Sequence, residues 1–209
     1  MPRRPRLEAP GAVHHVVAQS ASDGRIVVDD ADRLRFLDEL RRVIQEYSWE
    51  CVAYCVMTTH IHLIISTPTP NLGEGMGTLL GRYAFAFNRR HGRTGHVFRN
   101  RFWSRRIDRP HYLTCSAFYA VLNPVAAGLC THPGGFPWSS YLETVGAVPE
   151  SGFLSPGLLL STLDDDVAVA REKYRELIDE AVVRLRTRRA EEAWWRTVER
   201  AAAETLATG

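Results

Sequence analysis

Runs of apolar residues with two different periods divide the chain into strands and helices. Short runs rich in β-branched and apolar residues, together with one alternating run, predict four strands, over residues 12–18, 49–57, 61–66 and 97–107. Apolar side chains at helical spacing predict three helices, over residues 30–44, 79–90 and 110–122. The resulting order is strand, helix, strand, strand, helix, strand, helix. This order is typical of the ferredoxin-like α+β fold, an antiparallel sheet with helices on one face.

Proline and glycine indicate where these elements end. Asn123-Pro124 is expected to end or kink the third helix, because a proline restricts the residue before it. A stretch rich in proline and glycine, residues 133–137, closes the domain. Beyond it the chain predicts a loop and two further helices, over residues 165–185 and 190–207. We therefore expect a domain over residues 8–145 and a helical C-terminal extension over residues 146–209.

The composition agrees with a globular protein. The chain has 209 residues, of which 45% are hydrophobic and 24% are charged. No stretch approaches the roughly 18 uninterrupted apolar residues that cross a bilayer, so no membrane partner is expected. The N-terminus lacks the apolar segment of a secretory signal, and we expect a cytoplasmic location. The four cysteines form no CxxC pair, which argues against a metal–thiolate cluster.

Arginine is concentrated in one part of the chain. The net charge is only +2, yet nine arginines and a single acid lie between Arg82 and Arg109, with six aromatic residues interleaved. Such a basic strip is typical of a surface that binds nucleic acid, because arginine neutralises phosphate and aromatic rings stack on bases. Seven of these arginines are the candidate DNA contacts: Arg82, Arg89, Arg90, Arg99, Arg101, Arg105 and Arg106.

Two histidines in the third predicted strand could bind a metal ion. Side chains two residues apart on a strand point to the same face, so His60 and His62 would present two imidazoles together. Neighbouring imidazoles suit a divalent metal. His14 and His15 have opposite facing on the first strand, so at most one of them could share the face of His60 and His62.

The third predicted helix offers two tyrosines as nucleophiles. Tyr119 and Asn123 are four residues apart, so a phenol and an amide would project from one side of the helix. Tyrosine forms covalent intermediates, although its ordinary pKa near 10 makes it weak without a metal or base nearby. Tyr112 lies on the same helix, and spacing alone does not choose between the two.

Taken in order, several motifs resemble one family. They include Thr59-His60-Ile61-His62, Gly95-His96-Val97-Phe98 and Asn123-Pro124. The other matching stretches are residues 10–16, 54–58, 82–92, 101–102, 119–122 and 137–141. In this set the chain is similar to the REP-associated tyrosine transposases, which belong to the single-tyrosine HUH transposases of bacterial insertion sequences. The resemblance covers residues 8–145.

The resemblance implies a metal-dependent endonuclease and transesterase for single-stranded DNA. Such an enzyme cleaves and joins DNA near hairpins through a 5′-phosphotyrosine intermediate. The nucleophile would be Tyr119 rather than Tyr112. The ligands of a Mg²⁺ or Mn²⁺ ion would be His60, His62 and Asn123. The expected partner is single-stranded or hairpin DNA, and both a monomer and a dimer fit the sequence.

The chain also departs from the family pattern. Thr58-Thr59 stands where a Pro-Asn pair is usual, and residues 19–25 replace an Arg-Gly-Asn loop. Phe118 stands where an arginine often precedes the tyrosine. These differences leave the proposed ligands and the nucleophile in place. The alternative is a nucleic-acid-binding module of ferredoxin-like shape without catalysis, which would not need Tyr119.

Overall fold

The four predicted strands form one antiparallel sheet. The computed structural model describes residues 9–21 and 24–186. The sheet has the order β2-β3-β1-β4, and every pair of neighbouring strands is antiparallel. The strands are β1 (Ala12–Gln19), β2 (Glu50–Val56), β3 (His60–Thr67) and β4 (Trp103–Ile107). Because β1 and β3 are central while β2 and β4 lie at the edges, the predicted ferredoxin-like arrangement is confirmed.

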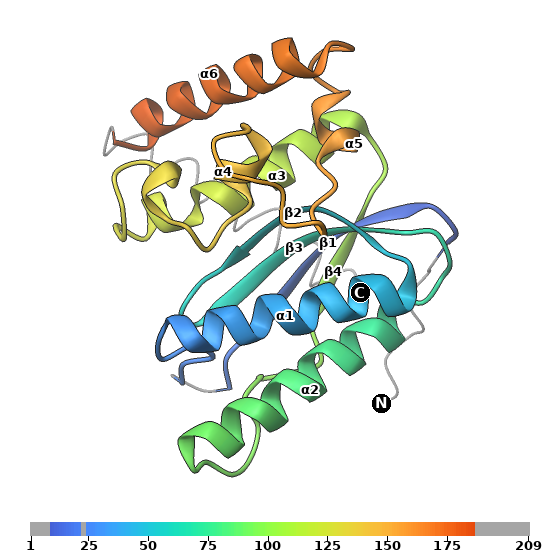
Figure 1. The fold of residues 1–209 in the computed structure, drawn as a ribbon, viewed down its shortest axis with the longest axis vertical. Helices are drawn as coiled ribbons and strands as arrows, with labels where there is room; N and C mark the ends of the chain where they lie inside the picture. The colour runs from blue at the N-terminus through green and yellow to red at the C-terminus, as the bar shows by residue number, and fades with distance from the viewer. Residues whose placement is uncertain (1–8, 22–23, 187–209) are drawn as a thin grey trace.

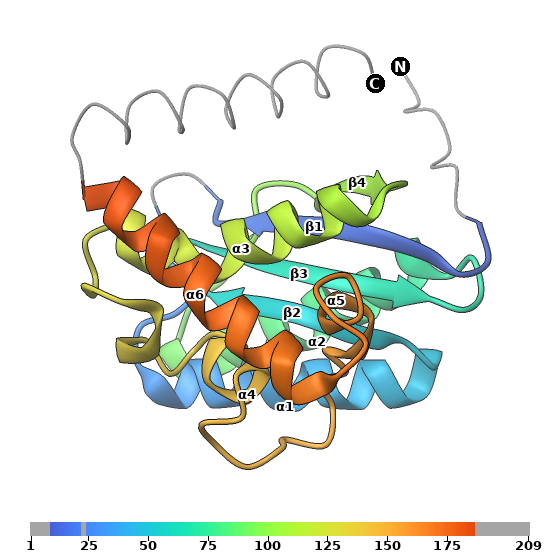
Figure 2. The same ribbon diagram turned by 90° about the horizontal axis from the view of Figure 1, so that it is seen from above.

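Helices lie on both faces of this sheet (Figure 1). The helices that connect strands, α1 (Asp30–Tyr47) and α2 (Leu72–His91), cover one face. The helix α3 (Pro110–Ala126) lies on the other face, and α6 (Val167–Arg186) packs against it (Figure 2). The remaining helices are short: η1 (Pro133–Gly135), α4 (Tyr141–Thr144) and α5 (Gly157–Leu160). Helix α3, with the C-terminal extension packed against it, thus covers the face that α1 and α2 leave open.

Strand β3 divides the interior into two cores. Its odd-numbered residues Ile61, Leu63 and Ile65 are buried in the core shared with α1 and α2. Ile64 points the other way and joins the core formed with α3 and α6. This alternation follows from the period of two along any strand. It also places His60 and His62 on the side of α3.

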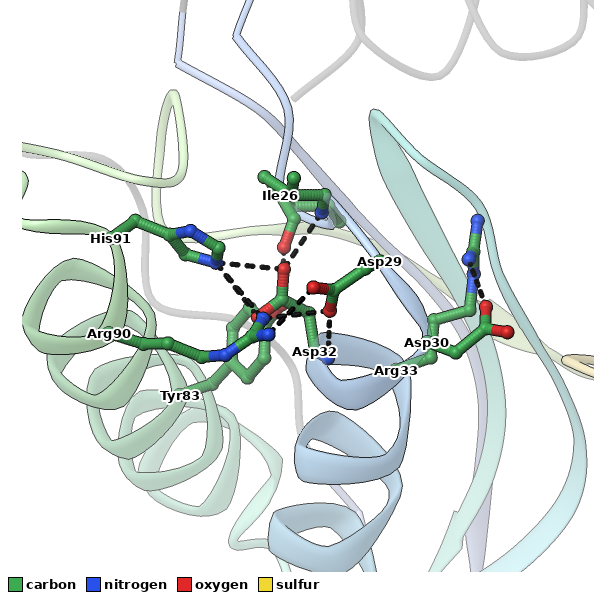
Figure 3. A network of polar contacts seen from close by, with 9 residues as sticks. Ile26, Asp29, Asp30, Asp32, Arg33, Tyr83, Arg90 and His91 are labelled. Carbon is green, nitrogen blue, oxygen red and sulfur yellow. Dashed lines mark hydrogen bonds and ion pairs between the residues drawn. The ribbon is translucent and has the colours of Figure 1, made fainter.

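A network of charged groups fixes the helices α1 and α2 to each other (Figure 3). Asp29 caps α1 by accepting a hydrogen bond from the amide of Asp32 at 3.1 Å. Asp32, only 2% exposed, accepts hydrogen bonds from Arg90 at 2.5 Å and from the amide of Val28 at 2.8 Å, and its carboxylate lies 3.0 Å from His91 Nε2. Arg90 also pairs with Asp29 at 2.6 Å. The end of α2 is therefore tied to the start of α1.

The fourth predicted strand is shorter than the sequence analysis indicated. Residues 103–107 pair with β1, whereas Phe98 makes only an isolated bridge to Ser20. From Val17 to Ser20 there are three residue steps (20 − 17), while the partner segment from Phe98 to Trp103 takes five (103 − 98). The two extra residues cannot fit the ladder, so the chain bends outward between the two paired segments.

Two helices are longer than predicted. Helix α2 begins at Leu72 instead of Leu79, because Leu72 and Met76 continue its buried face through a glycine-rich stretch. Helix α3 runs to Ala126, so the predicted end at Leu122 is wrong. Pro124 lies in the last turn of α3, where it removes only the one hydrogen bond that its own N–H would have made to Ala120, and the helix ends two residues later. Asn123 is therefore held in helical geometry.

The C-terminal extension is described only in part. The helix predicted over residues 165–185 is present as α6, whereas the one predicted over 190–207 falls outside the described residues. In the ranges 9–21 and 24–186, no helix combines the length and apolar character needed to cross a membrane.

Substitutions at the glycines of α2 test this packing. A β-carbon at Gly75 would meet ring carbons of Trp49, whose indole is held by a 2.7 Å hydrogen bond to Asn71. Gly75→Ala should therefore lower the free energy of unfolding by about 1–3 kcal/mol, the usual cost of overpacking. Gly77→Ala and Gly81→Ala, with open space around them, should raise it by about 0.5–1 kcal/mol. Urea unfolding followed by circular dichroism measures all three, and equal effects would contradict this packing.

Candidate active site

Three predicted side chains meet between β3 and α3. His60 Nε2 lies 3.1 Å from Asn123 Oδ1, and Asn123 Nδ2 lies 3.2 Å from His62 Nε2. His62 and Asn123 are 2% and 5% exposed, while His60 is only partly buried. One amide thus connects the two imidazoles, and one edge of the cluster opens to solvent.

Tyr119 lies beside this cluster. Its ring centroid is 5.1 Å from that of His62, with the two rings nearly perpendicular. Tyr112 is 45% exposed and contacts Arg105 and His111 instead. The structure therefore brings Tyr119, and not Tyr112, next to the histidine pair.

His15 completes the group of aromatic rings. Its Nε2 lies 3.1 Å from His62 Nδ1, and its ring meets those of Tyr119 and Trp103 edge-on at 5.9 and 5.6 Å. The register pairs Val17 with His62, so the odd-numbered residues of β1 share the face of His62. Sequence analysis limited the choice to His14 or His15, and the register, which no sequence pattern supplied, selects His15.

The burial of these rings keeps them uncharged near neutral pH. Loss of water around His62, reinforced by the neighbouring His15 and His60, holds its pKa well below 6.5. Desolvation lowers the pKa of His60 as well, against the opposing effect of the hydrogen bond that His60 donates to the Asn123 oxygen. Desolvation and the charge of Arg105 lower the pKa of His15 to about 4. Neutral imidazoles are the form that binds metal ions.

The donors of this cluster fit a divalent ion. The Nε2 atoms of His60 and His62 both face the amide of Asn123, His60 toward its oxygen and His62 toward its nitrogen. In the described part of the chain, no three His, Cys, Asp or Glu side chains form a group that could hold a metal ion. The candidate set thus depends on the Asn123 oxygen as its third donor, together with ligands from outside the protein such as a phosphate oxygen.

A polar cavity of about 140 Å³ opens next to His60. Its walls are formed by Gln19, Ser20, Thr59, His60 and Arg99. The bend before β4 brings Arg99 here, because its amide donates a hydrogen bond to the Gln19 carbonyl at 2.9 Å. Thr59 Oγ1 lies 3.1 Å from His60 Nδ1. The position where the sequence departs from the family pattern therefore carries a group that contacts a candidate ligand.

The candidate DNA-binding arginines differ in their surroundings. All seven are exposed. Three of them form ion pairs, Arg82 with Glu46 at 2.7 Å, Arg106 with Asp108 at 2.5 Å, and Arg90 within the α1–α2 network. Over the described ranges, no carboxylate lies within ion-pair distance of the other four, which are Arg89, Arg99, Arg101 and Arg105. Arg105 lies opposite His15 in the sheet, on the same face as the cluster.

Comparison with known proteins finds similarity to transposases. The family model of IS200-like transposases matches residues 11–109. A solved structure of a REP-associated tyrosine transposase bound to a REP hairpin gives a TM-score of 0.59 and 18% identity, over 80% of this chain and 93% of that chain. The solved structure of a transposase candidate from Deinococcus radiodurans gives a TM-score of 0.40 and 18% sequence identity, over 54% of this chain and 92% of that chain. No curated protein gives a match.

The two matches agree on one class of fold. The ferredoxin-like sheet is shared with the REP-associated transposase, and the model of IS200-like transposases matches the segment that holds all four strands.

The lowered pKa values predict how stability depends on pH. Above pH 6.5 the ring of His15 is neutral in both the folded and the unfolded chain. Below pH 6.5 the unfolded chain takes up a proton that the folded site resists until about pH 4, so stability falls across this window. We expect a loss of about 1–2 kcal/mol between pH 6.5 and pH 5 from this residue. Urea titrations at both pH values should show a shallower loss in His15→Gln, and equal slopes would contradict the assignment.

Proposed function

We propose that this protein is a transposase that cleaves and rejoins single-stranded DNA beside a hairpin through a covalent link to Tyr119. The observation that carries the proposal is the convergence of Tyr119 with His60, His62 and Asn123 on one face of the sheet. The match to the model of IS200-like transposases supports the strand-transfer activity. The similar structure bound to a REP hairpin supports a hairpin substrate.

The chemistry assigned to Tyr119 is a transesterification. The phenol oxygen attacks a backbone phosphorus, the bond to the 3′ oxygen breaks, and the 5′ phosphate becomes attached to the tyrosine. The departing strand takes up the proton and ends in a free 3′ hydroxyl. Attack of a 3′ hydroxyl on the phosphotyrosine reverses the step and joins the strands. One phosphate ester replaces another each time, so no nucleotide cofactor is consumed.

His60, His62 and Asn123 would hold a divalent ion, Mg²⁺ or Mn²⁺. When bound, such an ion supplies Lewis-acid polarisation of the phosphate. The lowered pKa values of both imidazoles and their shared contact with the amide of Asn123 support this assignment. Helix α3 carries both Asn123 and Tyr119, so the nucleophile and one ligand are held on the same rigid element.

The DNA backbone would follow the arginines without a carboxylate partner. Arg99 lines the cavity next to His60, and Arg105 lies on the face of the cluster beside His15. We assign these two to phosphates that flank the reacting one, and Arg89 and Arg101 to more distant phosphates. Arg82, Arg90 and Arg106 would contact DNA only by giving up ion pairs. Their share of binding is expected to be smaller.

Substitution of the two tyrosines tests the nucleophile. Tyr119→Phe should keep hairpin-DNA affinity but abolish the covalent adduct, because phenylalanine retains the ring and lacks the attacking oxygen. Tyr112→Phe is the matched control and should retain both. The measurement is denaturing gel electrophoresis after incubation with labelled hairpin strands taken from DNA flanking the gene, with Mg²⁺ or Mn²⁺ added.

Two outcomes would contradict the proposal. An adduct formed by Tyr119→Phe, or mapped by peptide analysis to Tyr112, would refute the nucleophile. Hairpin binding by the wild-type chain with no adduct at any metal concentration would indicate the non-catalytic binding module instead. Adduct formation that persists in excess chelator would refute the metal.

Salt titration tests the assignment of the arginines. Each phosphate contact to a single strand contributes about 0.7 to the slope of log affinity against log salt concentration. The double variant Arg99→Gln/Arg105→Gln should therefore reduce the slope by about 1.4. The control Arg82→Gln/Arg106→Gln, at two arginines held by Glu46 and Asp108, should change it less. Fluorescence anisotropy with labelled hairpin DNA measures both, and equal slopes would refute the distinction.

A further inference from the structure

We infer that His15 is a positioning residue that accepts the Nδ1 proton of His62 and so, together with Asn123, holds the tautomer of His62 whose Nε2 carries a lone pair. This inference rests on the proposed function, in which His62 is a metal ligand through that nitrogen. His15 would touch neither the metal nor the DNA. Its effect would act through one hydrogen bond inside the cluster.

A chain of three contacts carries the inference. Asn123 Oδ1 lies 3.1 Å from His60 Nε2, and Asn123 Nδ2 lies 3.2 Å from His62 Nε2. On the far side of the same ring, His62 Nδ1 lies 3.1 Å from His15 Nε2. Each nitrogen of His62 therefore has a different partner, and each partner restricts where the ring proton can be.

The donor and acceptor roles then follow in sequence. An amide nitrogen only donates, so His62 Nε2 accepts from Asn123 and carries no proton. The single proton of the neutral ring is consequently on Nδ1, where it is donated to His15 Nε2. His15 carries its own proton on Nδ1. The reverse arrangement would place a proton on His62 Nε2, the atom needed for metal binding.

The surroundings of His15 hold its ring in place for this role. The ring lies edge-on to Trp103 and to Tyr119, so packing on two sides limits its rotation. Its position on a central strand fixes the backbone through pairing with both β3 and β4. Partners of this kind, which hold the second nitrogen of a ligand histidine, typically change metal affinity by 10–100-fold when removed.

Nitrogen NMR of the metal-free protein reads the tautomer directly. Long-range ¹H–¹⁵N spectra of ¹⁵N-histidine-labelled wild-type chain should show His62 protonated at Nδ1 and unprotonated at Nε2. In His15→Phe, which keeps a ring of similar size and removes the acceptor, this pattern should be lost. His15→Gln, whose side-chain oxygen can accept the same hydrogen bond, should restore it. A wild-type His62 protonated at Nε2 would overturn the inference.

Metal affinity provides the second measurement. Titration of Mn²⁺ followed by electron paramagnetic resonance should show about 10–100-fold weaker binding in His15→Phe and near wild-type binding in His15→Gln. Circular dichroism and hairpin-DNA affinity check that each variant is folded. Equal Mn²⁺ affinity of folded His15→Phe and wild type would overturn the inference. Wild-type protein that binds no Mn²⁺ would refute the proposed metal ligands, whereas the tautomer spectra test His15 independently.

Discussion

The contact on which the site depends is the amide of Asn123 between two imidazoles. It is the place where helix α3 and strand β3 meet through polar groups. Because Asn123 lies inside the helix, one turn after Tyr119, the same contact also sets the height of the tyrosine above the sheet. A slip of α3 by one residue would rotate both side chains by about 100° and separate them from the histidines.

Strand β3 shows how one element can serve stability and chemistry together. Its odd-numbered residues Ile61, Leu63 and Ile65 are apolar and fully buried against α1 and α2, whereas two of its even positions are histidines. Because successive side chains of a strand point to opposite faces, the core on one face can be packed tightly without changing the site on the other. The C-terminal helix α6 supports the arrangement from outside by packing against α3.

Local patterns predicted the strand and helix order, because periodicity and turn residues act over a few neighbours. They also predicted that His60 and His62 share a face, since that follows from the strand alone. Properties that depend on pairing between distant segments could not be predicted from local sequence patterns. His15 needed the register of β1 on β3, and the outward bend before β4 needed the count of residues on both strands. The start of α2 and the end of α3 were predicted wrongly, because tertiary packing outweighed the low helix propensities of glycine and proline.

The basic strip illustrates why charge density alone does not locate a binding surface. The arginines that are adjacent in sequence separate in space according to the element that carries them. Arg90, at the end of α2, balances Asp29 and the buried Asp32, so its charge is used to hold two helices together. Arg99 and Arg105, on the segment that pairs with β1, have no such acids among the described residues and lie beside the histidine cluster. These two arginines would therefore supply positive potential where a phosphate reacts, whereas Arg82 and Arg90 on α2 pair with acids of the scaffold.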